Sequence, residues 1–130
     1  MKPPKCKPLQ FGTRYSNKAV RSVHYDGKIL SVEIQGEGFA YARVVFKQPV
    51  GFRILNEMDL TEFWKNYNLK NGWIYEVEEG GWIELESVRV DFTSPHIWPE
   101  LREYLLVDEN CISVICNQPP ELVELGSDPQ

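Results

Sequence analysis

Carboxylates are the chemically capable side chains that this sequence concentrates most strongly, and they gather in residues 73–87, WIYEVEEGGWIELES. If this segment forms two strands, one of its faces carries four glutamates and a tryptophan: Glu76, Glu78, Trp82, Glu84 and Glu86. Neighbouring carboxylates can exchange protons in acid–base catalysis, hold a hard cation, or attract a basic protein. A plain solvated face and a tryptophan that covers the edge of the core remain alternatives to each of these functions.

Other catalytic side chains are few, because the chain has only two histidines. His24 alternates with Val23 and Tyr25 beside an Asp-Gly turn, which indicates a structural role. His96 lies near Trp98 in a proline-flanked stretch, and such loops often carry functional residues. The sequence has no GxSxG, HExxH or Walker-type motif, and its glycine pairs lack the following helix that a phosphate cradle requires.

The three cysteines form no CxxC pair, which disfavours a disulfide scaffold and a zinc ribbon. Cys111 and Cys116 are five residues apart in a strand-like run, so they would point to opposite faces and could not share a metal ion. We therefore expect reduced thiols, no bound metal and no cofactor.

The formal net charge of −5 is unevenly distributed. Residues 1–25 carry six basic and no acidic side chains, whereas residues 26–130 carry eight basic and nineteen acidic ones, a net charge of −11. An acidic body repels nucleic acid and attracts basic proteins. The charge pattern therefore favours a basic protein partner over nucleic acid.

The length of 130 residues predicts one folded domain. We expect a flexible basic leader over residues 1–20, a single domain over residues 21–125, and a frayed tail over residues 126–130. No apolar run approaches the roughly 20 residues of a membrane-spanning helix, and the N-terminus lacks an apolar signal core. A soluble, cytoplasmic protein without a membrane partner is therefore expected.

Apolar alternation predicts the strands that position these groups. A hairpin is expected around Asp26-Gly27, followed by strands over residues 39–47 and 50–54. In residues 73–87 a three-residue loop, Glu79-Gly80-Gly81, keeps the polar and apolar faces apart, whereas a two-residue loop would mix them. The inward side chains of that hairpin would be Tyr75, Val77, Ile83 and Leu85, and its second strand could continue through Val88, Val90 and Phe92.

The remainder of the chain predicts another hairpin around residues 108–110 and a last short segment over residues 122–125. One helix is expected over residues 59–69, because Asp59 and Glu62 form a capping box and apolar residues follow at helical spacing. The sequence thus predicts an α+β fold: a mainly antiparallel curved sheet of about eight strands, with the 59–69 helix packed on it.

Three runs carry a resemblance to a known set of proteins: FRILNEMDLTEFW, GWIYEVEEGGWIELE and REYLLVDENCISVIC. Their layout resembles that of small uncharacterised bacterial proteins and would cover residues 45–121. The resemblance supplies no activity and no binding residues. In size and acidity such proteins are similar to the immunity partners of bacterial polymorphic toxins, which is an analogy rather than a shared motif.

Three functional hypotheses follow. The first is a non-enzymatic binding protein of the immunity type, which neutralises a basic toxin or nuclease through the acidic face and Trp82. The second is a small enzyme or metabolite-binding domain that uses the loop with His96 and Trp98. The third is a homo-oligomer formed through an exposed strand edge.

Overall fold

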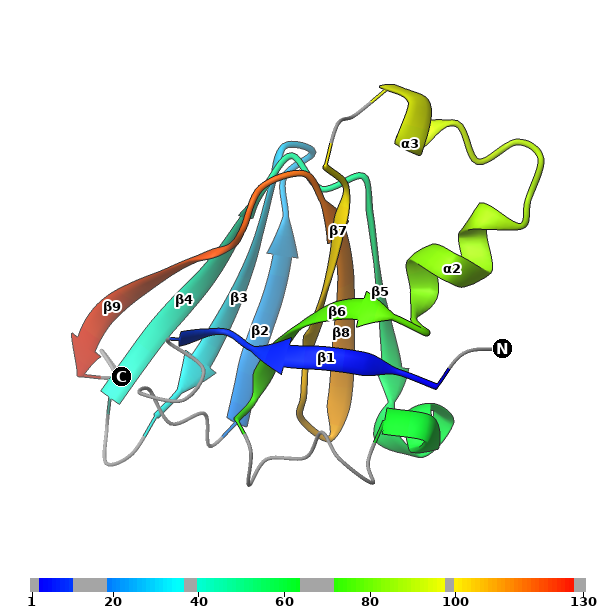
Figure 1. Cartoon of the computed structure of the whole chain (residues 1–130). Helices are drawn as coiled ribbons and strands as arrows, with labels where there is room; N and C mark the ends of the chain where they lie inside the picture. The colour runs from blue at the N-terminus through cyan, green and yellow to red at the C-terminus, as the bar shows by residue number, and fades with distance from the viewer. Residues whose placement is uncertain (1–2, 11–18, 37–39, 64–71, 98–99, 128–130) are drawn as a thin grey trace.

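The structure is a computed structural model that describes residues 3–10, 19–36, 40–63, 72–97 and 100–127. Within these ranges, nine strands form two antiparallel sheets that face each other (Figure 1). The five-stranded sheet has the order β1 (Lys5–Pro8), β6 (Ile74–Glu79), β7 (Arg102–Leu106), β8 (Asn110–Cys116) and β5 (Gly51–Asn56). The four-stranded sheet has the order β2 (Ala19–Tyr25), β3 (Ile29–Gln35), β4 (Ala40–Lys47) and β9 (Glu121–Ser127).

The α+β class and the antiparallel strands are confirmed, but the single curved sheet is wrong. The chain changes sheets between β4 and β5. At this corner Gln48 has a positive φ of 49° and donates its backbone amide to Lys28 O at 2.7 Å, whereas Val50 donates to Ile115 O at 2.8 Å. The backbone is thus bonded to the β2–β3 turn at Gln48 and to β8 at Val50, only two residues later. The strand that follows, β5, therefore joins the other sheet.

The hairpin around Asp26-Gly27 is confirmed and has a local cause. Oδ1 of Asp26 accepts hydrogen bonds from the backbone amides of Lys28 and Ile29, at 2.9 and 2.8 Å. Gly27 adopts a φ of +98°, which a residue with a side chain rarely takes. The second expected hairpin, β7–β8, is also present, with Leu106 opposite Ile112.

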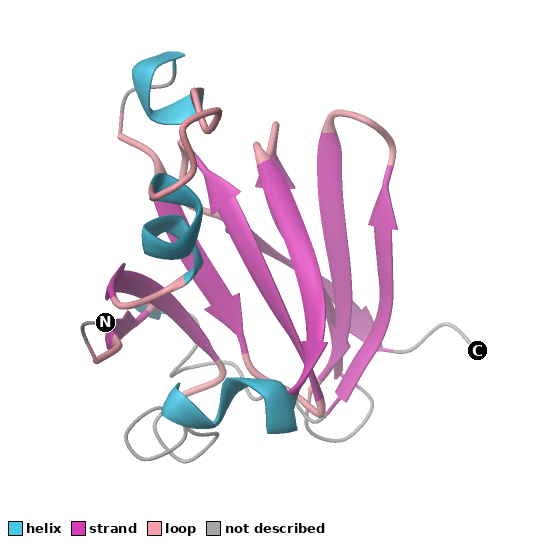
Figure 2. Ribbon diagram, turned by 90° about the vertical axis from the view of Figure 1, so that its right-hand side faces the viewer, coloured by secondary structure: helices cyan, strands magenta, loops and turns pink. Residues whose placement is uncertain are grey.

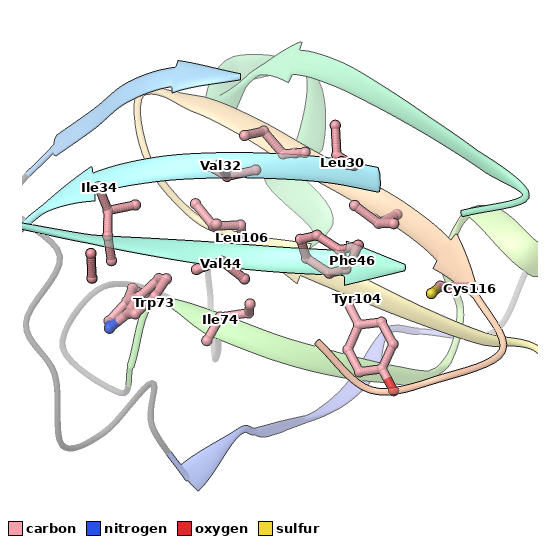
Figure 3. Close-up of a cluster of buried hydrophobic side chains, with 13 residues drawn as sticks. Leu30, Val32, Ile34, Val44, Phe46, Trp73, Ile74, Tyr104, Leu106 and Cys116 are labelled. Carbon is pink, nitrogen blue, oxygen red and sulfur yellow. The ribbon is translucent and has the colours of Figure 1, made fainter. Parts of the chain in front are cut away.

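The main core lies between the sheets (Figure 3). Strands β3 and β4 turn alternate side chains inward, as the sequence pattern predicted. The buried residues of these strands are Leu30, Val32, Ile34, Ala42, Val44 and Phe46. The five-stranded sheet and the residue before β6 contribute the side chains that pack against them: Trp73, Ile74, Tyr104, Leu106, Ile112, Val114 and Cys116.

A second apolar cluster covers the other face of the five-stranded sheet. It is formed where Leu60 and Phe63 of η1 (Glu57–Phe63) pack on Tyr75, Leu105 and their neighbours. This 3-10 segment starts earlier than the predicted 59–69 helix, because Oδ1 of Asn56 accepts the amide of Met58 at 2.9 Å. Residues 64–69 of the predicted helix lie outside the described ranges.

The predicted hairpin over residues 73–87 is wrong in its second half. Residues 82–87 form the short helix α2 (Trp82–Ser87), and α3 (Ser94–Ile97) follows it; both stand outside the strand layers (Figure 2). Strand β6 has no free edge for a second hairpin strand, because β1 pairs with one side of it and β7 with the other. The expected continuation is absent too, since Val88 and Val90 are 82% and 97% exposed within the turns that follow α2.

Both ends of the described chain contribute strands. Residues 5–8, expected in a flexible leader, form β1, with Cys6 opposite Val77. Gly126 and Ser127, expected in a frayed tail, complete β9 beside β4. No helix in the ranges that the structure describes is long and apolar enough to cross a membrane.

Candidate functional site

A pocket of about 280 Å³ opens where β6 ends, β7 begins and α2 starts. Five carboxylates and one guanidinium contribute to its lining, and we refer to it as the acidic pocket. Its residues are Glu76, Val77, Glu78, Glu79, Gly81, Ile83, Glu84, Leu101, Arg102 and Glu103.

Three of the glutamates singled out in the sequence, Glu76, Glu78 and Glu84, line this pocket together. Glu86 and Trp82 do not line it. The reason is the helical geometry of α2, in which residues two positions apart point in different directions, whereas a strand would have aligned Glu84 with Glu86.

Sequence reasoning missed two further carboxylates of the pocket. Glu79 was assigned to a hairpin loop but ends strand β6. Glu103 lies on β7 and is only 2% exposed. Its sequence neighbours are strand-forming residues, which do not indicate a pocket. The one available signal was its position between Arg102 and a strand that was expected from Tyr104 onward.

Several of these acids already have partners within the protein. Arg102 forms an ion pair with Glu76, with 3.4 Å between Nη1 and Oε1. Glu84 accepts a hydrogen bond from the backbone amide of Gly80. Glu103 accepts one from the backbone amide of Ile83 at 2.8 Å. These three side chains hold the pocket's walls together.

Glu78 and Glu79 differ from the other acids because both are exposed and neither is paired with a cation in the described part of the chain. Lys5 of β1 lies opposite Glu79 in the strand pairing, but no ion pair joins them among the described residues, so both carboxylates remain available to a partner. Burial raises the pKa of Glu103, although the amides of Ile83 and Trp82 oppose that shift.

The thiol of Cys6 on β1 lies in the same buried and acidic environment as Glu103. Burial, together with the charges of Glu103 and Glu78, raises the pKa of Cys6 to about 12. A thiol with such a pKa stays protonated at neutral pH and is a poor nucleophile. Cys6 therefore belongs to the packing of β1 rather than to a reactive centre.

Trp82 anchors α2 to the edge strand β5. The guanidinium of Arg53 lies 4.9 Å from the centre of the Trp82 ring, and the indole Nε1 donates to Glu86 at 3.1 Å. Glu86 also pairs with Arg89 at 2.6 Å, and the hydrogen bond from Arg89, then that from Trp82, lowers the pKa of Glu86. Trp82 and Glu86 thus form a cluster with Arg53 and Arg89 that is separate from the acidic pocket.

The second pair of candidates is less well placed. The backbone of His96 belongs to α3, which projects from the sandwich (Figure 1), and Trp98 lies outside the described ranges. Among the described residues, no three histidine, cysteine, aspartate or glutamate side chains stand close enough to hold a metal ion.

Comparison with known proteins gives no relative to guide the choice between functions: no family model, no curated protein and no solved structure matches this chain. The resemblance to small bacterial proteins therefore stays a prediction.

Proposed function

We propose that this chain is a non-enzymatic binding protein that captures a basic segment of another protein at the acidic pocket. The observation that carries the proposal is the pair of exposed carboxylates Glu78 and Glu79, which form no ion pair within the part of the chain that the structure describes and which line a pocket with three more. Unpaired surface charge of one sign steers a partner of the opposite sign and raises its association rate.

Glu76, Glu84 and Glu103 shape the pocket, whereas Glu78 and Glu79 are the acids that would attract the partner. Because the first three acids are fixed by Arg102 and by backbone amides, the pocket keeps its shape when empty. A preformed site loses little conformational entropy on binding. A lysine or arginine side chain would enter between the fixed walls and meet Glu78 and Glu79.

An immunity-type role is the fuller form of this proposal. A basic toxin or nuclease would be neutralised if the acidic pocket occupied the cationic groups that it uses for substrate. The three free cysteines support placing such a protein in a reducing compartment such as the cytoplasm.

The test uses a fluorescently labelled peptide of alternating lysine and glycine, titrated with the full chain and followed by anisotropy. The double variant Glu78→Lys and Glu79→Lys should weaken binding by about tenfold or more, equivalent to about 1.4 kcal/mol. The matched control reverses two exposed acids elsewhere, Asp91→Lys and Glu124→Lys, which changes the net charge equally.

Equal losses in the two double variants would reduce the interaction to net charge and would reject the acidic pocket as the site. Sedimentation of the free chain at several concentrations tests the third hypothesis, a homo-oligomer. A concentration-dependent mass that the glutamate variants abolish would identify the partner as a second copy of the chain.

A further inference from the structure

A second and larger pocket, of about 420 Å³, lies where the open edges of the two sheets meet. Strand β2 is the edge of the four-stranded sheet, and β5 is an edge of the five-stranded sheet. We call this pocket the edge crevice. It is lined by Ala19, Val20, Arg21, Ser22, Val23, Ile54, Asp108, Glu109, Asn110 and Ile112.

Two contacts between the sheets bound the crevice along the strands. At one end, the rings of Tyr25 on β2 and Phe52 on β5 meet edge to face at 5.3 Å. At the other end, the amide of Val20 donates to Oδ2 of Asp108 at 2.7 Å, across 88 residues of sequence. These two contacts therefore fix the spacing between the sheets at both ends of the crevice.

Part of the wall is apolar and continuous with the core, and the rest is polar. Val20 and Val23 pack against the main core from β2, and buried Ile112 belongs to it. Ile54 faces the same gap from β5 and is 47% exposed. Ile54 is the part of this wall that remains half-exposed, and a ligand in the crevice would cover it.

A peptide strand is a poor occupant, although β2 is an edge. The outward amide of Val20 already has an acceptor in Asp108, and the β2–β3 register shifts between Val20 and Ser22. Bulges and occupied edge groups are the features by which proteins block strand addition. The crevice therefore suits a compact molecule rather than an extended chain.

The charge at the Asp108 end selects the head group of that molecule. Asp108 uses one oxygen for Val20, and Glu109 is exposed without a cationic partner in the described ranges. The one basic residue in the lining, Arg21, places its guanidinium 5.3 Å from the centre of the Tyr41 ring. The polar end of the crevice is thus dominated by carboxylates.

We propose that the edge crevice binds a small amphipathic cation, an aliphatic or aromatic body that carries an ammonium group. The body covers Val20, Val23 and Ile54 beside the buried Ile112, and the ammonium group lies against Asp108 and Glu109. A volume of about 420 Å³ falls in the range of about 300 to 1,000 Å³ that is typical of small-molecule sites. This site is independent of the acidic pocket.

The test titrates the full chain with hexylammonium and, separately, with hexanoate of equal chain length, followed by ¹H–¹⁵N correlation spectra. Hexylammonium should shift the amide signals of Val20, Val23, Ile54 and Ile112, whereas hexanoate should not. Glu109→Lys should weaken hexylammonium binding about fivefold. Ile54→Ala should weaken both the binding and the shifts, because it removes apolar surface from the wall.

The double variant Glu78→Lys and Glu79→Lys separates this proposal from the proposed function, because it should leave hexylammonium binding at the edge crevice unchanged. Shifts confined to residues 76–81 would place the cation in the acidic pocket and overturn the proposal. Equal shifts with hexanoate, or no shifts up to the solubility limit, would also overturn it.

Discussion

The carboxylate of Glu103 on β7 accepts a hydrogen bond from the backbone amide of Ile83 on α2, with 2.8 Å between Oε1 and N. Glu103 is 2% exposed. A helix of six residues cannot hold itself together, so this contact, with Trp82 against Arg53, fixes its start on the sheet. One buried side chain thereby sets both the position of α2 and a wall of the acidic pocket.

Replacing Glu103 tests this role directly. Glu103→Ala leaves the amide of Ile83 without its acceptor and should lower the free energy of unfolding by about 2 kcal/mol in urea titrations. Glu103→Gln keeps an oxygen acceptor and should cost less. Hydrogen exchange at Ile83 should accelerate in the alanine variant and change little in the glutamine variant. Equal exchange in both would contradict the role of the hydrogen bond.

The pH dependence of stability should carry the signature of the same side chain. Burial raises the pKa of Glu103 above 4.5, so the folded state holds its proton more tightly than the unfolded state. Its contribution to stability is therefore complete below the ordinary glutamate pKa and is lost as pH rises through the raised value. The difference in free energy of unfolding between the parent chain and Glu103→Gln should fall over that window.

Comparing the parent chain with Glu103→Gln removes the effect of acids whose pKa is lowered, rather than raised, in the folded state. The pKa of Glu33 is lowered, first by its hydrogen bond from Arg43, and this stabilisation disappears as pH falls below the ordinary glutamate value. Both proteins share that contribution, so it cancels. A difference that rises with pH would contradict a raised pKa at Glu103.

Close packing at Gly81 should make it intolerant of a side chain. A Cβ atom there would lie 2.6 Å from both Val77 Cγ1 and Glu103 Oε2. Gly81→Ala should therefore lower the free energy of unfolding by about 1 to 3 kcal/mol. Gly51→Ala is the matched control, because its Cβ would meet only the Trp82 ring at 3.5 Å, an ordinary contact. Thermal melts of the two variants compare them; similar midpoints would contradict the predicted overlap.

The thiols should be inert in the folded protein. The pKa of Cys6 is about 12, and burial raises the pKa values of Cys111 and Cys116. Iodoacetamide at neutral pH should modify all three only at the rate of unfolding, and mass spectrometry should show unmodified protein under native conditions. Fast modification of Cys6 alone would show that β1 detaches from β6.

Local signals predicted the β2–β3 and β7–β8 hairpins well. Asp26-Gly27 specifies its turn through its own side chain and a positive φ, and the alternating residues of β3 and β4 identify their buried faces. The β7–β8 hairpin joins neighbouring segments of chain, so its pairing also follows from the order of the sequence.

The failures involve contacts between distant segments. Residues 82–87 have a pattern short enough to fit either a strand or a helix, and the decision comes from Glu103, twenty residues further on. Strand β1 has no pattern of its own; it exists because β6 offers an edge. The acidic pocket depends on the first of these effects, so the sequence identified Glu76, Glu78 and Glu84 but assigned their grouping to a hairpin that does not form.

Strands β1 and β9 each form an edge of a different sheet, beside β6 and β4. Trimming by a protease at either end would uncover a row of unsatisfied backbone donors and acceptors on a strand that is otherwise interior. Such rows template intermolecular pairing and aggregation. Loss of β1 or β9 would therefore replace a shorter edge strand by a longer one, which favours self-association.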